Sequence, residues 1–440
     1  MADANTLLDR LGRVAASNRE PVIVKGRVRR TVGYSLEVTG CDQGVGAECL
    51  VEVDGTLIPA EVVGFSDGNT FLMPLADVTG LRPGAGVRPQ RERKGPVIEG
   101  LLGRVVDGMG RPLDGRPLEQ TPIAPTERPG RFNPLQRVPI ATALDVGVRS
   151  INGLLTVGVG QRLGLFAGSG VGKSMLLGMM SRYTGADVVV VGLIGERGRE
   201  VREFIDESLG PAGLRRAVVV ASPADDAPVL RLRAARLATE IAHRYRALGR
   251  NVLLVMDSLT RVAQAQREIG LAVGEPPTTK GYPPSVFALL PRLVEQAGNV
   301  GGSGSVTAFY TVLAEGDDQQ DPIVDAARAI LDGHIVLNRR LADSGHFPAI
   351  DIEASISRVM PKLVDADHIR LATAFKELSS RYAQQRDLIN VGAYVAGSDP
   401  VTDRAIKLRA EMNQYLTQPI TERADLKDSR ARLARLLGAG

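Results

Sequence analysis

Between residues 164 and 337, short apolar runs alternate with helical segments, and this alternation constrains the fold more than any other feature of the chain. Each run has the length of a strand, well short of the roughly 20 residues of a membrane helix. The runs occupy residues 163–166, 188–194, 217–221, 252–256 and 305–312. Apolar strands separated by helices are typical of a parallel sheet that is covered on both faces. We therefore predict an α/β core, with helices from Lys173, from about Glu200 and from about Ala227.

The segments on either side of this core have different patterns. Residues 22–80 contain short β-branched runs separated by turn residues, which indicates a small β-barrel. Seven prolines lie between Pro112 and Pro139, so this stretch is predicted to be an ordered, extended connection and not a helix. From about Asp365 the apolar spacing is helical to the end of the chain. The predicted domains are a β-barrel at 1–96, an α/β domain at 97–363 and a helical domain at 364–440.

The composition argues against several classes of protein. The 440 residues include 54 Lys+Arg and 50 Asp+Glu, a net charge of +4, and the barrel region is neutral and poor in aromatic residues. A nucleic-acid-binding surface is therefore not expected. Cys41, Cys49 and four scattered histidines lack metal-ligand spacing, and we interpret the cysteines as small buried side chains in a reducing compartment. The N-terminus has no charged region followed by an apolar run, so neither a signal peptide nor a membrane span is expected.

A glycine-rich segment joins the first core strand to the first core helix. It consists of Ala167, Gly168, Ser169, Gly170, Val171, Gly172, Lys173 and Ser174. Its glycines allow backbone N–H groups to turn toward phosphate oxygens, and the start of the helix adds a favourable dipole. In such a loop the lysine reaches the β- and γ-phosphates and the Ser174 hydroxyl binds Mg²⁺. The strict pattern has glycine at Ala167, a small departure, and the alternative is a glycine-rich turn that binds no nucleotide.

Two carboxylates are predicted at the same edge of the sheet as this loop. Asp257 ends the strand at 250–257, and Glu196 follows the preceding apolar strand. Because the carboxyl ends of parallel strands share one edge, Asp257 would hold Mg²⁺, directly or through water, and Glu196 would polarise the water that attacks the γ-phosphate. Glu200 falls on the next helix at surface-like spacing. The alternatives are an aspartate that caps a helix and a solvated Glu–Arg pair.

Five segments closely resemble the export ATPases of bacterial type III secretion, which are relatives of the catalytic beta subunit of rotary ATP synthases. They are the loop at 166–174 and the segments at 195–200, 256–261, 280–285 and 355–360. The resemblance covers nearly the whole chain. Three more segments look most like the flagellar branch of that family, at 133–140, 333–337 and 386–394. The resemblance implies a P-loop, RecA-like ATPase core between the barrel and the helical domain.

The resemblance also implies roles that the residues alone do not indicate. ATP would bind at each subunit boundary of a homohexameric ring, with Arg197 near the γ-phosphate. Arg358 would be an arginine finger presented to the neighbour's nucleotide, and Phe347 would stack on adenine, where relatives often carry Tyr. Without the resemblance, Phe347 would be interpreted as a core residue and Arg358 as a surface ion-pair residue.

The hypothesis that follows from the resemblance is a cytoplasmic Mg²⁺-dependent ATPase, at the inner-membrane export apparatus, that energises flagellar protein export. Its implied partners are export substrates, chaperones, the export gate, a stalk and regulatory subunits, and not nucleic acid. The irregular segment at 268–285 would face a central pore or form a plain surface loop. The open alternatives are an injectisome ATPase, a rotary ATP synthase subunit, a hexameric RNA translocase and a non-catalytic nucleotide-binding subunit.

Overall fold

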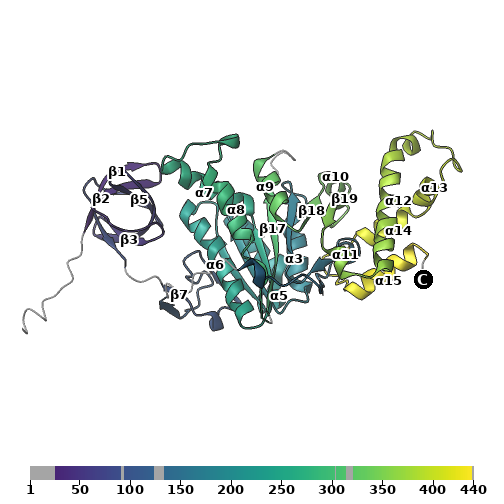
Figure 1. The fold of residues 1–440 in the computed structure, drawn as a ribbon, viewed down its shortest axis with the longest axis horizontal. Coiled ribbons are helices and arrows are strands. Elements are labelled where there is room, and N and C mark those ends of the chain that lie inside the picture. Colours follow the sequence, from purple (N-terminus) through teal and green to yellow (C-terminus); the bar gives the residue numbers. More distant parts are fainter. Residues whose placement is uncertain (1–24, 91–93, 123–132, 303, 314–320, 439–440) are drawn as a thin grey trace, which may run out of the picture. The chain divides into compact units, whose positions relative to one another are not determined.

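The computed structural model describes residues 25–90, 94–122, 133–302, 304–313 and 321–438. These residues fall into two compact units, one formed by residues 25–90 with 272–274 and the other by the remainder from residue 94 onward (Figure 1). Each unit has a hydrophobic core of its own. The finer boundaries at residues 97 and 364 stay a prediction.

The first unit is a closed antiparallel β-barrel, which confirms the prediction for this region (Figure 1). Its strands are β1 (Gly26–Val32), β2 (Ser35–Thr39), β3 (Glu48–Val53), β4 (Thr56–Ser66), β5 (Asn69–Pro74) and β6 (Gly86–Pro89), in the order β1-β2-β5-β4-β3-β6. Val38, Val51 and Val62 are among the side chains that fill the barrel. Cys49 belongs to this core, but Cys41 is only half-buried, and their Sγ atoms lie 3.8 Å apart.

The centre of the second unit is a nine-stranded sheet. Five strands match the predicted apolar runs: β12 (Arg162–Ala167), β13 (Val188–Ile194), β14 (Ala217–Ser222), β15 (Asn251–Asp257) and β17 (Ser305–Leu313). The other four are β8 (Arg104–Val106), β16 (Gly298–Asn299), β18 (Gly333–Leu337) and β19 (Ile350–Ser357). The order is β19-β18-β12-β17-β15-β13-β14-β8, with β16 paired to β17. The predicted parallel sheet is confirmed for the strands from β18 to β8.

Two strand pairs of the sheet are antiparallel, which the sequence did not predict. Strand β19 runs against β18, and β16 runs against β17. Residues 338–349 connect β18 to β19, and an antiparallel neighbour needs no long crossover connection. As a result, the chain leaves β19 at the amino ends of the parallel strands.

Helices cover both faces of the sheet, as predicted. On one face, Leu177 of α3 (Lys173–Tyr183) packs in the same core as Val191 of β13. On the other face, α6 (Pro228–Ala247) lies against β13, β14 and β15. A Cβ atom on Gly192, the next residue of β13, would lie 3.2 Å from the Cβ of Ala238 on α6. Successive strand residues therefore face different helices, which is why these strands are apolar throughout.

The end of the chain is helical, as the sequence predicted. Its helices are α12 (Ala366–Asn390), α13 (Pro400–Lys407), α14 (Arg409–Leu416) and α15 (Leu426–Leu436). Asp365 caps α12 by accepting the backbone N–H of His368. Phe375 is fully buried against Tyr415, with 5.6 Å between the ring centroids. Within the described ranges, no helix is both long and apolar enough to cross a membrane.

Two helical turns lie where the sequence analysis predicted none. Pro134–Gln136 form a 3-10 turn with Pro134 at the first position, where the missing N–H costs nothing. Residues 123–132 of the proline-rich stretch lie outside the described residues. Helix α7 (Leu259–Ala272) runs through Gly270 into the segment expected to be irregular. A Cβ atom on Gly270 would lie 2.9 Å from Cγ of the Pro283 ring, so close packing favours glycine inside this helix.

Candidate active site

The glycine-rich loop lies between β12 and α3, at the carboxyl edge of the sheet. Gly170 and Gly172 have φ angles of +75° and +86°, a left-handed conformation that favours glycine. Gly172 caps α3, so the unpaired N–H groups of the first helical turn are directed at the loop. Ala167 is buried as the last residue of β12, and its methyl group is accommodated within the strand. The backbone therefore has the geometry of a phosphate-binding loop.

Lys173, the first residue of α3, lies between the two predicted carboxylates. Its Nζ atom is 2.6 Å from Asp257 Oδ1 and 2.8 Å from Glu196 Oε1. Asp257 ends β15 and Glu196 follows β13, its neighbour in the sheet. The exposed fractions of the side chains are 12% for Lys173, 3% for Asp257 and 15% for Glu196. The structure thus brings together three residues that the sequence places at three separate strand ends. We call them the Lys173 cluster.

Burial affects the charged groups of this cluster in different ways. For Asp257, burial is the largest influence and raises the pKa of the carboxyl group, while the ammonium of Lys173 acts in the opposite direction. For Lys173, burial lowers the pKa, but the charges of Asp257 and Glu196 outweigh burial and raise the pKa overall. The lysine is therefore firmly protonated, and the ionised form of Asp257 depends on a cation beside it.

Two threonines at this edge support the cluster and were not predicted. Thr311 lies in β17, between β12 and β15, and its Oγ1 donates to Asp257 Oδ1 at 2.6 Å. Thr260 accepts the backbone N–H of Leu313 at 2.9 Å and so ties the end of β17 to α7. Thr311 is fully buried, but Ser305 and Thr307 of the same strand are buried as well, so the sequence of β17 does not single Thr311 out.

The residues of this site fit a nucleotide phosphate with Mg²⁺. The loop provides backbone donors, and a Cβ atom at Gly170 would meet nothing within 4 Å, so the space beside it is open. The Ser174 hydroxyl and the Asp257 carboxylate are oxygen ligands of the kind that Mg²⁺ prefers. In the described part of the chain, no group of three or more His, Cys, Asp or Glu side chains could hold a metal ion. At Mg²⁺ sites that bind nucleotides, phosphate and water supply most of the ligands.

Two further residues border the loop. A Cβ atom on Gly172 would lie 3.3 Å from Cδ1 of the Phe347 ring, so the ring lies against the end of the loop. Phe347 is 45% exposed, which contradicts the alternative of a core residue. Arg339, which the sequence analysis did not single out, begins α10 (Arg339–Asp343) and donates to the Ser169 carbonyl at 3.1 Å.

Two of the predicted residues lie at the margin of the site. Arg197 precedes α4 (Gly198–Glu203), and its side chain is 80% exposed, with NH1 3.9 Å from a Glu200 carboxylate oxygen. The structure therefore does not place Arg197 in the Lys173 cluster. Ser174 is exposed on the first turn of α3.

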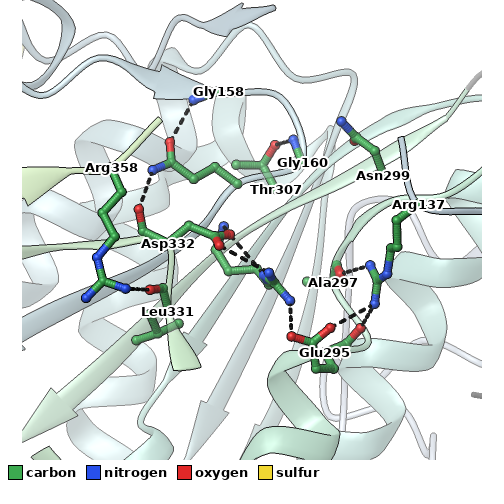
Figure 2. Close-up of polar contacts among 12 residues, drawn as sticks. Arg137, Gly158, Gly160, Glu295, Ala297, Asn299, Thr307, Leu331, Asp332 and Arg358 are labelled. Atoms are coloured by element: carbon green, nitrogen blue, oxygen red, sulfur yellow. Dashed lines mark hydrogen bonds and ion pairs between the residues drawn. The ribbon is translucent and has the colours of Figure 1, made fainter. Parts of the chain in front are cut away.

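Arg358 lies at the amino ends of the parallel strands, opposite the carboxyl ends that carry the glycine-rich loop. It follows β19, where Ser357 is paired with Gly333, and the next residue, His334, is paired with Gly164 of β12. This register puts Arg358 level with the start of β12, about 16 Å along the strand from Ala167 at roughly 3.3 Å per residue. Its NH1 donates to the Leu331 carbonyl at 3.0 Å (Figure 2). An arginine side chain cannot span that distance to the loop of its own subunit.

Comparison with known protein families assigns most of the chain. Residues 28–90 match the beta-barrel domain of the ATP synthase alpha/beta family, and residues 147–357 match its nucleotide-binding domain. Residues 364–435 match the T3SS EscN ATPase C-terminal domain.

Individual relatives agree with these matches. The chain is 62% identical to the flagellum-specific ATP synthase of Pseudomonas aeruginosa, over 95% of this chain and 94% of that protein. It is 58% identical to the flagellum-specific ATP synthase of Salmonella typhimurium, over 92% and 91%. The assembled ATPase EscN from the enteropathogenic E. coli type III secretion system has a TM-score of 0.87 at 42% identity, covering 94% of this chain and 100% of EscN. This chain belongs to the family of flagellum-specific ATP synthases and type III secretion system ATPases.

Proposed function

We propose that this chain hydrolyses ATP with Mg²⁺ at the glycine-rich loop. The observation that carries the proposal is the Lys173 cluster, in which one ammonium and two carboxylates meet beside a phosphate-binding loop. The phosphates are bound by the loop residues Ala167, Gly168, Ser169, Gly170, Val171, Gly172, Lys173 and Ser174. Phe347 lies against the loop and is 45% exposed, so its ring is accessible for adenine to stack on.

The chain's own residues divide the chemistry between them. Glu196 orients the attacking water and accepts its proton, while Lys173 stabilises the charge that develops on the γ-phosphate. Mg²⁺, held by Ser174 and Asp257, would neutralise charge on the phosphates. Thr311 fixes the orientation of the Asp257 carboxylate by its hydrogen bond. Arg197 is assigned to the γ-phosphate by family resemblance, and its exposed side chain has the freedom to move there.

Arg358 acts in trans in this proposal, as the arginine finger of a homohexamer. Its place at the amino ends of the parallel strands supports this role, because the finger and the loop of one subunit then lie at opposite ends of β12. An exposed guanidinium there is available to a neighbour's nucleotide. Such a finger is worth roughly 10³ or more in rate.

The activity is proposed to energise flagellar protein export at the cytoplasmic face of the inner-membrane export apparatus. The 62% and 58% identities to flagellum-specific relatives support this branch. An injectisome role is the second candidate, because a type 3 secretion system ATPase of Sinorhizobium fredii is 46% identical over 94% of this chain. EscN has also been solved in complex with its central stalk EscO, which supports a stalk as one partner. Export substrates, chaperones, the export gate and regulatory subunits are the further proposed partners.

The variant Glu196→Gln tests both levels of the proposal. It keeps the shape of the side chain but cannot accept a proton, so we expect ATP hydrolysis by the purified protein to fall at least about 10²-fold. In the bacterium that encodes the chain, the same variant should stop the appearance of flagellar proteins in the medium. Glu203→Gln is the matched control, because Glu203 pairs with Arg199 on the exposed side of α4 and should be neutral in both assays.

The two readouts can fail separately. Unchanged hydrolysis by the Glu196→Gln protein would show that Glu196 is not the base. Lost hydrolysis with normal flagellar export, and with a defect in the delivery of injectisome proteins, would move the chain to the injectisome branch.

A further inference from the structure

The amino end of β12 carries a second polar network, remote from the Lys173 cluster. Gln161 lies immediately before β12 and is fully buried. Its Nε2 donates to the Asp332 carbonyl at 3.2 Å and to Ser357 Oγ at 3.1 Å, and its Oε1 accepts the N–H of Gly158 at 2.8 Å. One buried amide therefore holds both the 331–332 backbone and the residue that precedes Arg358.

An ion pair beside Gln161 holds the same backbone from its other side. Asp332 Oδ2 accepts both the backbone N–H of Arg162 at 3.0 Å and its Nε at 2.9 Å, and Oδ1 accepts from NH2 at 3.1 Å. Arg162 also pairs with Glu295, which in turn pairs with Arg137 (Figure 2). Three bonds to one aspartate fix the backbone at residue 332 much more firmly than a single contact would.

Arg358 depends on this backbone for its position. Its guanidinium donates to the Leu331 carbonyl at 3.0 Å (Figure 2) and to the Arg328 carbonyl at 3.4 Å, and its own N–H donates to the Asp332 carbonyl at 3.1 Å. These acceptors are all main-chain oxygens. A shift of residues 331–332 would therefore carry the guanidinium with it.

We propose that Gln161 and the Arg162–Asp332 ion pair are positioning residues for Arg358 in ATP hydrolysis. The inference rests on the proposed function, because it requires Arg358 to act as the finger. These groups lie about 16 Å along β12 from the loop of their own subunit at roughly 3.3 Å per residue, so they do not touch that subunit's nucleotide, and Gln161 is fully buried. They act by holding the Leu331 and Asp332 carbonyls to which Arg358 is bound. Strand β12 thus has the subunit's own phosphate loop at one end and the support of its finger at the other.

The variant Asp332→Asn tests this proposal with a double-mutant cycle. It keeps the volume of the side chain but removes the charge that holds Arg162. We expect kcat for ATP to fall roughly 10- to 100-fold with little change in KM, because small displacements of a catalytic group cost rates of that order. In the Arg358→Ala background, the same substitution should cause no further fall, since there is no finger left to misplace.

A matched control separates positioning from a loss of stability. Asp114→Asn breaks a comparable partly buried ion pair, between Asp114 and Arg104 at 2.7 Å, on β8 at the other edge of the sheet. It should lower the thermal midpoint to a similar extent while leaving kcat unchanged. If the Asp332→Asn protein does not fold, Arg162→Lys replaces it, because Lys keeps the charge but cannot make the two-pronged contact.

The outcomes distinguish this inference from the proposed function. If Arg358→Ala lowers kcat but Asp332→Asn does not, the positioning role is wrong and the finger stands. Equal losses from Asp332→Asn in both backgrounds would likewise overturn it, since the effect would not pass through Arg358. If Arg358→Ala leaves kcat unchanged, the finger and its support are both wrong.

Discussion

The two ends of strand β12 hold their cations in opposite ways. At the carboxyl end, Lys173 is 12% exposed and is held by two side-chain carboxylates at 2.6 and 2.8 Å. At the amino end, Arg358 is exposed and its guanidinium is held by the main-chain carbonyls of Leu331 and Arg328.

The difference in acceptors gives the two ends different electrostatic character. At the Lys173 end, two carboxylates against one ammonium favour the arrival of a further cation such as Mg²⁺. At the Arg358 end, carbonyl dipoles orient the guanidinium without neutralising it, and the charge of Asp332 is already balanced by Arg162. One end is therefore suited to receive a nucleotide with its metal, and the other to offer a positive charge. This contrast is what a ring with sites between subunits would require.

The largest expected effect comes from removing the cation at the Lys173 end. Lys173→Met keeps the apolar stem but loses the ammonium. The phosphates and the negative charge that develops in the transition state then lose the positive group that stabilises them. We expect ATP hydrolysis to fall at least about 10³-fold, measured as phosphate release. Lys362→Met, on an exposed turn of α11 (Met360–Leu363), is the control and should leave activity unchanged. Substantial hydrolysis by the Lys173→Met protein would count against the whole site.

A somewhat smaller effect is expected at the other end, and it should appear in the neighbouring subunit. Arg358→Ala chains should hydrolyse ATP roughly 10³-fold more slowly in uniform rings. In rings mixed from Arg358→Ala chains and Lys173→Met chains, Lys173→Met subunits supply an intact finger to Arg358→Ala subunits with an intact loop. ATP hydrolysis should therefore return in proportion to the number of interfaces at which an intact finger meets an intact loop. Mixed rings as inactive as either parent would mean that Arg358 serves its own subunit.

The smallest effect concerns the histidine beside the finger. Burial, followed by the charges of Arg328 and Arg358, lowers the pKa of His334. Removing one positive charge favours the imidazolium, so Arg358→Ala should move the pKa of His334 upward toward its ordinary value near 6.5. An NMR titration of labelled histidine measures this shift, with Arg370→Ala on the exposed face of α12 as the control. A pKa that stays fixed or falls would show that the Arg358 charge does not reach His334.

The parts of the site that the sequence predicted are those defined by short-range spacing. The loop from Ala167 to Ser174 carries its own glycines and follows its own strand. Asp257 and Glu196 each end an apolar run, and parallel strands bring such ends to one edge. The barrel and the terminal helices were likewise evident from their periodicity. These features depend on a few consecutive residues, so they can be recognised from the amino-acid sequence alone.

Other features depend on which strands become neighbours. Thr311 supports Asp257 only because β17 lies between β12 and β15. The sequence did not predict that β19 runs antiparallel to β18. It therefore did not predict that Arg358 lies at the amino ends of the parallel strands. Family resemblance supplied a role for Arg358, but nothing in its spacing connects it to Gln161, 197 residues before it in the numbering.

The sequence by itself therefore determined the α/β core, the phosphate-binding loop and the two carboxylates, because local turn chemistry and apolar runs specify them. Only the tertiary structure decided which distant side chains meet. It placed Lys173 between Asp257 and Glu196, and it placed the Phe347 ring against Gly172. It also placed Arg358 on main-chain carbonyls, about 16 Å from its own loop at roughly 3.3 Å per strand residue. The physical reason is that strand order and register are fixed by packing over the whole domain, and they set which distant side chains meet.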